Sequence, residues 1–532
     1  MKVLFAVLLS LSLLLPLPAS AVDQADLMKK IEDMSRQLES LKQQMNEMQK
    51  KETVKEERIT KVEKKAETTA PTSKPTWLEI GGDYRGRIDS LSGTVHDYFQ
   101  FVPNPAAFGF PAGPPTVVPV SSLKVKNDAL LTNRLGLNLK ARATEDVTVK
   151  ARLLMYKVWG HESADPVAGP SSAFFADKFF IFDGNVSHIP QDNVLRVDQA
   201  FATWTNIAKL PVWFSLGRRP STAGVPTNIR QNVEKTGSAG VPGLLIDYAF
   251  DGGTIGVAPD IEALPGAYAK VCYGKGFDSG FRPNNGLKDV NFLGINVVPY
   301  DTDNFHFEVQ WDRAFDLFAF PELNNGSAIG FGPNTNLGDV DQYGATAMGK
   351  IEKLGGGDLN LFVSGGISKT HPNDNLVTVS APGVPGGFLP VAGLMYDAGT
   401  PKESRTGSAI YLGARYDITS TGTKLGAEYN YGSKNWIAFA PASDDLWTSK
   451  LGTHGSVYEA YVIQEIKGKQ ISKLGKAYFR LGYQYYDFKY TGSNNWVGAP
   501  KSMSDLNNPA NAQLFPPLDE AHDIYLTFDV EF

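Results

Sequence analysis

Alternation of apolar and polar residues dominates the chain from Trp77 onward. In residues 134–144 the odd positions carry leucine and alanine, whereas most even positions carry arginine, lysine or asparagine. Successive side chains of a β-strand point to opposite faces, so this pattern predicts a strand with one apolar and one charged face. The same period of two recurs in 78–89, 305–312, 424–431, 479–485 and 524–532.

The alternating segments favour a membrane barrel over a soluble β-sandwich. They run for about 9–14 residues, which is long for soluble strands and enough to cross a bilayer at a tilt. Aromatic residues also gather at the ends of the apolar faces, as two interfacial girdles require. These residues are Trp77, Tyr84, Trp159, Tyr248, Phe250, Trp311, Tyr483 and Tyr485. We therefore predict an all-β fold, a transmembrane antiparallel β-barrel over residues 77–532.

The turn signals set the number of strands. Seven short connections alternate with eight long ones, which gives sixteen strands if Asp251–Gly266 is one of the short turns. A further strand at Thr254–Val257 would give seventeen strands, and the last strand would then run in the wrong direction. Bacterial single-chain barrels have an even number of strands, so we predict sixteen, with eighteen as the alternative.

The last residues form a strand pattern that ends on an aromatic residue. Five apolar residues alternate with polar ones up to Phe532. This pattern resembles the terminal strand of Gram-negative outer-membrane barrels, whose final aromatic residue is read by the outer-membrane insertion machinery. We expect that machinery to be a partner of this chain. The predicted assembly signal consists of Phe528, Val530 and Phe532.

Residues 1–21 have the pattern of a secretory signal peptide. A positive start at Met1-Lys2 precedes an apolar run over 3–17, and Ala19-Ser20-Ala21 fits a cleavage site. A membrane-anchor helix is disfavoured because the apolar run is short. The sequence therefore predicts export from the bacterial cytoplasm.

Residues 22–67 have the heptad pattern of a coiled coil. Their apolar residues are spaced alternately by four and three, which gives a stripe only two positions wide per heptad. A single amphipathic helix on its own domain would need a wider stripe, so self-association is favoured. Residues 68–76 are rich in threonine and proline and predict an extended linker. The predicted coiled-coil core is Leu27, Ile31, Met34, Leu38, Leu41, Met45 and Met48.

Composition narrows the function. The 532 residues include 51 Lys and Arg against 57 Asp and Glu, which argues against nucleic acid as a partner. Cys272 is the single cysteine, and the seven histidines show no metal-ligand spacing. The chain also lacks a G-x-S-x-G motif and a P-loop. We therefore predict no catalytic, cofactor or metal site, and no enzyme activity.

The polar faces of the predicted strands supply candidate pore-lining residues. Cations are frequent on early strands, and carboxylates on later ones. One interpretation is a basic wall facing an acidic wall across a pore. The other is that these charges pair across neighbouring strands in a wet lumen. Cys272 lies on a polar face as an unreactive thiol. The candidates are Arg85, Arg87, Arg134, Lys140, Arg142, Lys150, Arg152, Glu308, Asp312, Glu428 and Arg480.

Several stretches resemble a Gram-negative family of outer-membrane porins that is catalogued as a domain of unknown function. They include residues 77–91, 133–160, 214–222, 244–256 and 271–277. The resemblance covers most of 77–532 and implies a barrel and a pore without naming a substrate. More loosely, a heptad segment before a sixteen-strand barrel is similar to trimeric sugar- and anion-selective porins. That similarity implies a homotrimer.

Three functions fit these features. The first is an outer-membrane porin for passive diffusion of small hydrophilic or charged solutes, with the N-terminal segment in the periplasm. The second is a structural barrel that sheathes a partner, such as a multihaem cytochrome in transmembrane electron transfer. The third, which is weaker, is an adhesin that acts through its loops. The polar inner face favours the porin, because about sixteen strands enclose an aqueous channel.

Overall fold

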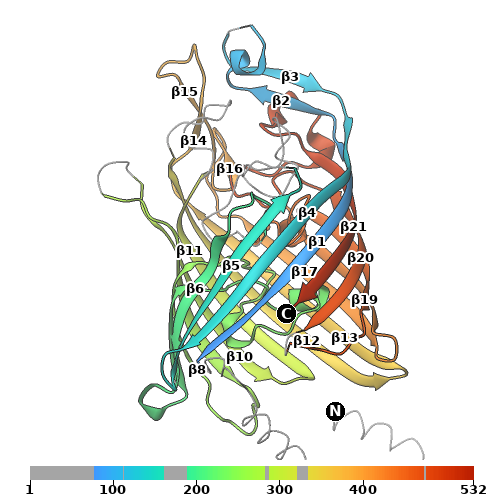
Figure 1. Ribbon diagram of the computed structural model, residues 1–532. Coiled ribbons are helices and arrows are strands. Elements are labelled where there is room, and N and C mark those ends of the chain that lie inside the picture. The colour runs from blue at the N-terminus through green and yellow to red at the C-terminus, as the bar shows by residue number, and fades with distance from the viewer. Residues whose placement is uncertain (1–76, 112, 161–187, 282–286, 320–333, 473–474) are drawn as a thin grey trace, which may run out of the picture. The chain divides into compact units, whose positions relative to one another are not determined.

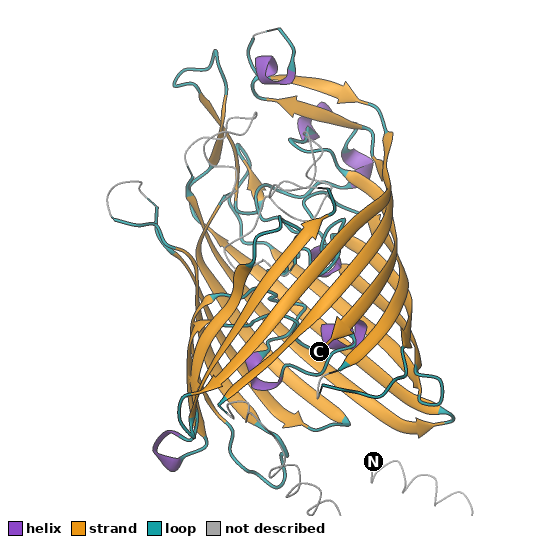
Figure 2. Cartoon of the chain, in the orientation of Figure 1, coloured by secondary structure: helices purple, strands orange, loops and turns teal. Residues whose placement is uncertain are grey.

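The computed structural model describes residues 77–111, 113–160, 188–281, 287–319, 334–472 and 475–532. The predicted signal peptide, coiled coil and linker lie outside the described residues. Sixteen strands form one closed antiparallel barrel (Figures 1 and 2). They are β1 (Leu78–Val95), β4 (Leu123–Arg142), β5 (Val147–Val158), β6 (Arg196–Trp204), β7 (Val212–Arg218), β8 (Asp251–Val257), β9 (Tyr268–Phe277), β10 (Val290–Asp301), β11 (Phe305–Phe318), β12 (Asn336–Leu354), β13 (Gly357–Pro372), β17 (Thr406–Ile418), β18 (Thr423–Gly432), β19 (Gly455–Glu465), β20 (Lys476–Phe488) and β21 (Leu518–Glu531).

The barrel closes where its first and last strands meet. Arg85 of β1 lies opposite Asp529 of β21 on one side and opposite Arg134 of β4 on the other. Every other barrel strand pairs with its neighbours in barrel order. A closed ring leaves no strand edge unpaired, so the backbone polar groups are satisfied without water. The prediction of a sixteen-strand antiparallel barrel is confirmed.

Short turns and long loops lie at opposite ends of the barrel, which we call the short-turn rim and the long-loop rim (Figure 1). One predicted boundary is wrong. Asp251–Val257 is strand β8, and the turn that follows it is 258–267. The preceding long connection runs from 219 to 250, so the total of sixteen still holds. Residues 244–250 have the apolar character of a strand because they are buried inside the barrel.

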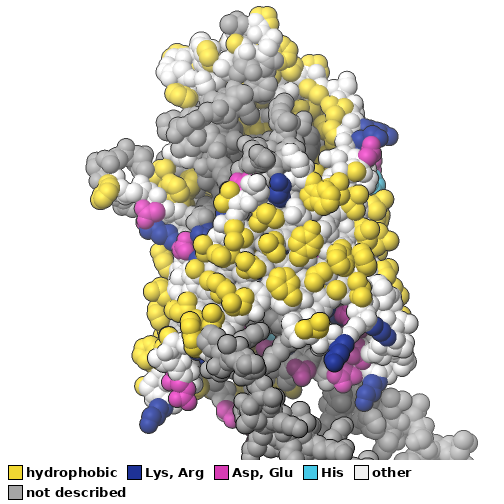
Figure 3. Space-filling view, in the orientation of Figure 1, with side chains coloured by type: hydrophobic (Ala, Val, Ile, Leu, Met, Phe, Trp, Pro, Cys, Tyr) yellow, Lys and Arg dark blue, Asp and Glu magenta, His cyan; other side chains and the backbone are white. Residues whose placement is uncertain are grey.

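The outer surface of the barrel is apolar. Figure 3 shows hydrophobic side chains over the middle of one face, with most charged side chains toward the rims. Exposed apolar residues lie at alternate strand positions, opposite in parity to the buried ones. A continuous exposed apolar surface of this kind fits contact with lipid acyl chains. Examples from around the barrel are Leu216, Ile255, Val271, Ile295, Val309, Leu361, Leu412, Leu425, Leu481 and Leu526.

Two long connections fold into the barrel. We call residues 219–250 inner loop A and residues 433–454 inner loop B. They pair with each other through backbone hydrogen bonds: Phe439 N–H donates to the Leu245 carbonyl at 2.8 Å, and Asp247 N–H donates to the Phe439 carbonyl at 2.8 Å. Their apolar side chains pack against inward-facing residues of the wall in one buried cluster. That cluster includes Leu244, Leu245, Ile246, Tyr248, Phe250, Trp436, Ile437 and Phe439 from the loops, and Phe292, Val340, Phe362 and Tyr411 from the wall.

Tyr248 and Phe250 therefore do not belong to an outer aromatic girdle as predicted. They are 1% and 5% exposed and stack on each other in the buried cluster. Phe250 also stacks on Phe292 of β10, with ring centroids 4.4 Å apart. A buried inner loop and a membrane strand both need apolar residues, so hydrophobicity alone does not distinguish them.

Smaller elements decorate the loops. None of the described helices has the length and apolar character that a membrane-spanning helix needs. The inner loops carry α3 (Thr227–Gln231), η5 (Gly237–Ala239) and η6 (Lys450–Gly452); one short turn carries η4 (Ile207–Lys209). The long-loop rim carries β2 (Tyr98–Val102), η1 (Pro105–Phe108), β3 (Thr116–Val120), β14 (Val377–Ser380), β15 (Phe388–Gly393), β16 (Tyr396–Asp397), η7 (Met503–Asp505) and η8 (Pro509–Asn511).

Candidate functional site

The candidate functional site is the interior of the barrel. All the predicted pore-lining residues have the strand parity that faces this interior. They divide into three groups by exposure. Arg134 and Arg152 are half-buried, and Lys140, Arg142 and Lys150 are more open to solvent. The buried group, which the inner loops cover, comprises Arg85, Arg87, Glu308, Asp312, Glu428 and Arg480.

Asp444 of inner loop B lies among four arginines of the wall. Its carboxylate is 2.6 Å from Arg85, 3.7 Å from Arg134 and 3.6 Å from Arg480. Arg87 Nη1 donates a hydrogen bond to the Asp444 carbonyl oxygen at 3.0 Å. Burial alone would raise the pKa of Asp444, but the surrounding guanidinium groups outweigh burial and hold it well below its usual range. Inner loop B is thus fixed to strands β1, β4 and β20 through one carboxylate.

The backbone at this anchor is strained. Ala442, Ser443 and Asp444 have φ of 52°, 47° and 69°, which places three consecutive non-glycine residues in the left-handed region. Each costs roughly 1–2 kcal/mol relative to the right-handed conformation. The ion pairs of Asp444 offset this cost, because they form only when the turn points its carboxylate at the wall.

A second buried cluster joins both inner loops to strands β18 and β19, which follow β20 in the barrel order. Arg230 of α3 pairs with Asp445 of inner loop B at 2.6 Å and with Glu459 of β19 at 3.1 Å. Lys450 of inner loop B lies 2.5 Å from both Glu459 and Glu428. All five side chains are at most 5% exposed. Every charge therefore has a partner, as burial of ionic groups requires.

Wall residues also bind the carboxyl end of α3. Arg480 Nη1 donates to the Arg230 carbonyl at 2.8 Å, and the Tyr478 hydroxyl donates to the Gln231 carbonyl at 2.8 Å. The last carbonyls of a helix lack partners within the helix, and cations there also oppose its dipole. Strand β20 begins at the short-turn rim, so inner loop A reaches down to that end of the barrel.

The charged residues of β11 lie in a different network. Asn296 of β10 donates to Glu308 Oε2 and to Gln310 Oε1, both at 3.0 Å. Gln310 in turn donates to both carboxylate oxygens of Asp312, at 2.7 and 2.8 Å. Neither Glu308 nor Asp312 faces a basic wall across open space.

Pairing across adjacent strands explains much of the charge pattern. Arg85 and Asp529 lie on neighbouring strands and form a 2.6 Å ion pair. Arg87 of β1 also pairs with Asp523 of the neighbouring strand β21, at 3.2 Å. The first cationic strand and the last acidic strand are therefore adjacent rather than opposite, because barrel closure joins them.

Three of the predicted pore-lining cations are solvent-accessible and lie near the short-turn rim. Lys140 and Arg142 of β4 share one carboxylate, Glu79, at 3.1 and 3.2 Å. Lys150 of β5 lies opposite Lys140 and makes no ion pair with any residue that the structure describes. This sector of the inner wall, which we call the basic sector, carries three cations and one carboxylate.

Two glycines let the inner loops approach the wall closely. A side chain at Gly366 of β13 would come within 2.6 Å of the Trp436 ring. One at Gly344 of β12 would come within 2.7 Å of Leu245 Cδ1. These wall positions therefore serve as flat contact surfaces for the apolar side chains of the loops.

Several interior residues were missed by the sequence analysis because they lie on loops and not on strands. These are Arg230, Asp444, Asp445 and Lys450. Glu459 was also missed, although it lies at a buried position of strand β19. One signal was present for the inner loops: both contain apolar runs, at 244–250 and 436–440, inside long polar connections. Among the residues that the structure describes, no group of three or more His, Cys, Asp or Glu side chains is arranged to hold a metal ion.

The terminal strand presents its apolar residues outward. Phe528 and Phe532 are 36% and 43% exposed, and Val530 shares their face. Phe532 N–H donates to the Gly82 carbonyl at 2.9 Å, and Gly82 N–H donates back at 2.8 Å. The last residue thus completes the β1–β21 pairing, while its role as an assembly signal stays a prediction.

The fold and its two faces define an outer-membrane type of β-barrel: sixteen antiparallel strands, an apolar exterior and a charged interior. The chain belongs to the family described as "Protein of unknown function (DUF3373)", whose model matches residues 124–532. The resemblance predicted from the sequence is confirmed at this level.

Solved structures with a similar fold are outer-membrane proteins. OmpT of Vibrio cholerae is 14% identical, with 87% of this chain and 100% of that chain covered and a TM-score of 0.37. OprB of Pseudomonas putida is 10% identical, with 86% and 94% covered and a TM-score of 0.41. Salmonella typhi OmpF is 9% identical, with 85% and 97% covered and a TM-score of 0.37. Such low values do not transfer function. The comparison with curated proteins gave no match.

Proposed function

We propose that this chain forms an outer-membrane channel for passive diffusion of small hydrophilic or charged solutes. The observation that carries the proposal is the division of side chains between the two faces of the closed barrel. Apolar side chains cover the outside, whereas the inward positions carry charges, some of them in contact with solvent. An exterior of this kind suits lipid, and an interior of this kind suits water and ions.

The proposed orientation places the long-loop rim outside the cell and the short-turn rim in the periplasm. Bacterial barrels generally have short periplasmic turns and longer extracellular loops. Trp77 and Phe532 then both lie on the periplasmic side. A signal peptide over residues 1–21 and a periplasmic coiled coil over 22–67 fit this orientation, and the coiled coil would join three barrels into a homotrimer.

The inner loops supply the proposed selectivity of the channel. They bury and neutralise most charges near strands β17–β21, and they leave the basic sector of β4 and β5 in contact with solvent. Three cations against one carboxylate attract anions and repel cations at close range. We therefore expect a narrow channel that prefers small anions.

The interior favours a channel over a sheath for a multihaem cytochrome. A partner inside the barrel would need the space that inner loops A and B occupy. Those loops pack on the wall through a buried apolar cluster and through buried ion pairs. A partner that displaced the loops would have to cover the same apolar wall residues and pair the same buried charges.

Single-channel recording of the purified full-length chain tests the proposal. Stepwise conductance in a planar bilayer is expected, with a reversal potential in a KCl gradient that shows preference for chloride. A barrel that keeps its heat-modifiable gel mobility, and is therefore folded, but gives no conductance steps would refute the channel. Equal permeability of potassium and chloride would refute the proposed anion preference of the basic sector, but not the channel itself.

A further inference from the structure

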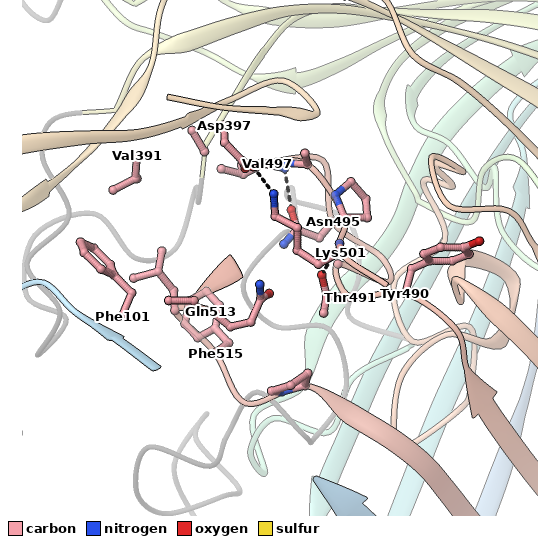
Figure 4. Close-up of a pocket in the computed structure, with 18 of the residues that line it drawn as sticks. Phe101, Val391, Asp397, Tyr490, Thr491, Asn495, Val497, Lys501, Gln513 and Phe515 are labelled. Carbon is pink, nitrogen blue, oxygen red and sulfur yellow. Dashed lines mark hydrogen bonds and ion pairs between the residues drawn. The ribbon is translucent and has the colours of Figure 1, made fainter. Parts of the chain in front are cut away.

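A cavity of about 480 Å³ lies among the loops of the long-loop rim (Figure 4). Most of its walls come from three connections that are far apart in the sequence: 96–122, 373–405 and 489–517. Trp447 and Thr448 of inner loop B, with Phe488 and Leu518 at strand ends, complete the lining. This volume is within the range of small-molecule sites, about 300–1,000 Å³. The cavity is lined by a different set of residues from the charged interior, and the proposed channel does not use it.

Backbone hydrogen bonds hold the three connections around the cavity. Phe101 N–H donates to the Gln513 carbonyl at 2.9 Å, which joins the first connection to the third. Met395 N–H donates to the Trp496 carbonyl at 2.9 Å, which joins the second to the third. The cavity is thus preformed, and a ligand does not need to order these loops on binding.

Much of the lining is apolar and includes flat rings. Phe101, Tyr490 and Phe515 contribute aromatic rings, and Val391 and Val497 contribute branched aliphatic groups (Figure 4). Aromatic rings at a partly solvated surface bind other flat apolar groups, because stacking removes large areas from water.

The charges of the cavity cancel. Lys501 forms an ion pair with Asp397, and the same carboxylate accepts a hydrogen bond from Ala499 N–H at 2.9 Å. These are the charged side chains of the lining. A charged ligand would lose its hydration on entering the cavity and would find no free opposite charge there, so binding of charged ligands is disfavoured.

Two carboxamides leave hydrogen-bonding groups available in the cavity. Asn495 Oδ1 accepts from Val497 N–H at 2.6 Å, and Gln513 Nε2 donates to the Asn511 carbonyl at 2.8 Å. In the described part of the chain, the Asn495 amino group and the Gln513 side-chain oxygen have no hydrogen-bond partner. The Asn495 amino group is thus left to donate to a ligand, and the Gln513 side-chain oxygen to accept from one.

From these features we propose that the cavity is a binding site for a neutral organic molecule that has a flat apolar face and hydrogen-bonding groups. The aromatic rings hold the apolar face. Asn495 and Gln513 bind the polar groups and fix the orientation of the molecule. The neutral Lys501–Asp397 pair excludes ionic analogues.

Isothermal titration of the detergent-solubilised full-length chain with 4-nitrophenyl β-D-glucopyranoside tests the site. This probe is neutral and combines an aromatic ring with hydroxyl groups. We expect saturable binding to the unmodified chain. Methyl β-D-glucopyranoside, which lacks the ring, and 4-nitrophenyl sulfate, which is anionic, should each bind at least tenfold more weakly.

Two variants locate the binding. Val391→Trp fills the cavity and Phe515→Ala removes one ring, so each should weaken binding at least tenfold. Phe110→Ala is the matched control, because Phe110 is 45% exposed on the same rim and does not line the cavity. Single-channel conductance of all three variants should match the unmodified chain, which separates this site from the proposed channel.

The proposal fails if the unmodified chain does not bind the neutral probe. It also fails if Val391→Trp and Phe515→Ala bind the probe as well as Phe110→Ala does. Tighter binding of the sulfate than of the glucoside would overturn the assignment of a neutral ligand.

Discussion

At the scale of single residues, the inner face of this barrel is an ionic contact surface for the chain's own loops. Asp444 shows why. It is separated by 359 residues from Arg85, yet the two form a 2.6 Å contact with both side chains buried. Removing one partner of a buried ion pair is costly, since the other charge stays buried and unpaired. The position of inner loop B therefore depends strongly on this carboxylate.

Asp444→Asn is expected to release inner loop B from the wall. The loss of the charge should cost about 3–5 kcal/mol of loop anchoring, because the surrounding arginines lose their counter-charge. Limited proteolysis within 433–454 should become faster, and the single-channel conductance should rise. Asp487→Asn, which breaks a surface pair with Lys489, is the control and should change neither. Unchanged proteolysis and conductance in Asp444→Asn would contradict the anchor.

The depressed pKa of Asp444 sets the pH dependence of the same anchor. A carboxylate whose pKa is lowered on folding stabilises the folded state at pH values above its unfolded pKa, about 4. That stabilisation is lost as the pH falls toward the lower folded value. Protease resistance of inner loop B should thus persist from pH 7 to about pH 4 and decrease in stronger acid. Loss of resistance already at pH 6 would be inconsistent with this assignment.

Cysteine labelling can separate the three environments of the wall. In a Cys272→Ser background, Lys150→Cys should react readily with a water-soluble thiol reagent, because it lies in the basic sector. Leu139→Cys should stay unlabelled in the bilayer, since it faces outward on β4. Arg87→Cys should react slowly, because inner loop B covers it. Equal rates at positions 150 and 139 would mean that the strand register is wrong.

Alternation along each strand was enough to predict which residues face inward, since the period of two does not depend on the rest of the fold. It did not predict burial. Lys150 and Arg87 have the same kind of position in the pattern, but Asp444 and its loop cover only Arg87. The covering segments come from connections without a period, and the contacts join residues hundreds of positions apart.

At the scale of elements, residues 244–250 and 251–257 show that a count of turns predicts the number of strands better than their boundaries. The number of strands was correct because two errors cancelled: a strand was predicted before Asp251, where inner loop A lies, and β8 was predicted to be a turn. The boundaries were wrong because Leu244, Leu245 and Ile246 are as apolar as a membrane strand while lying in inner loop A. Strand β8 itself contains three glycines and little side-chain bulk, so its own signal was weak.

The terminal element β21 gives a direct test of assembly. Deleting Phe532, or replacing it with Asp, should lower the amount of folded protein in the outer membrane, because the exposed ring belongs to the predicted assembly signal. The measurements are surface levels and heat-modifiable gel mobility. Phe479→Ala is a suitable comparison, since it removes an exposed ring from the neighbouring strand β20 and should reduce assembly less. Normal levels of the Phe532 variants would rule out the signal.

At the scale of the whole molecule, the described barrel is one part of the chain, and the prediction that a coiled coil over residues 22–67 holds three copies together can be tested directly. Ile31→Asp combined with Leu38→Asp should weaken a homotrimer, because both charges would be buried in adjacent core layers. Sedimentation of the detergent-solubilised protein measures the change. The barrel itself should persist, since its strands pair without residues 22–67. A monomer in the unmutated protein would end the proposal, and a trimer that resists both substitutions would place the contact on the barrel walls.

The junction between β1 and β21 also determines the order in which the interior can form. Arg85 binds Asp529 across this junction and Asp444 of inner loop B. Its guanidinium group therefore joins residues from the start, the late part and the end of the barrel sequence. Contacts of such long sequence separation form late, because the entropy of closing long loops must be overcome first. Inner loop B therefore finds its complete binding surface only after the final strand has been added. A nascent barrel that still lacks β21 is consequently an intermediate in which inner loop B is not fully anchored, and the chain completes the narrowing of its interior in its last folding step.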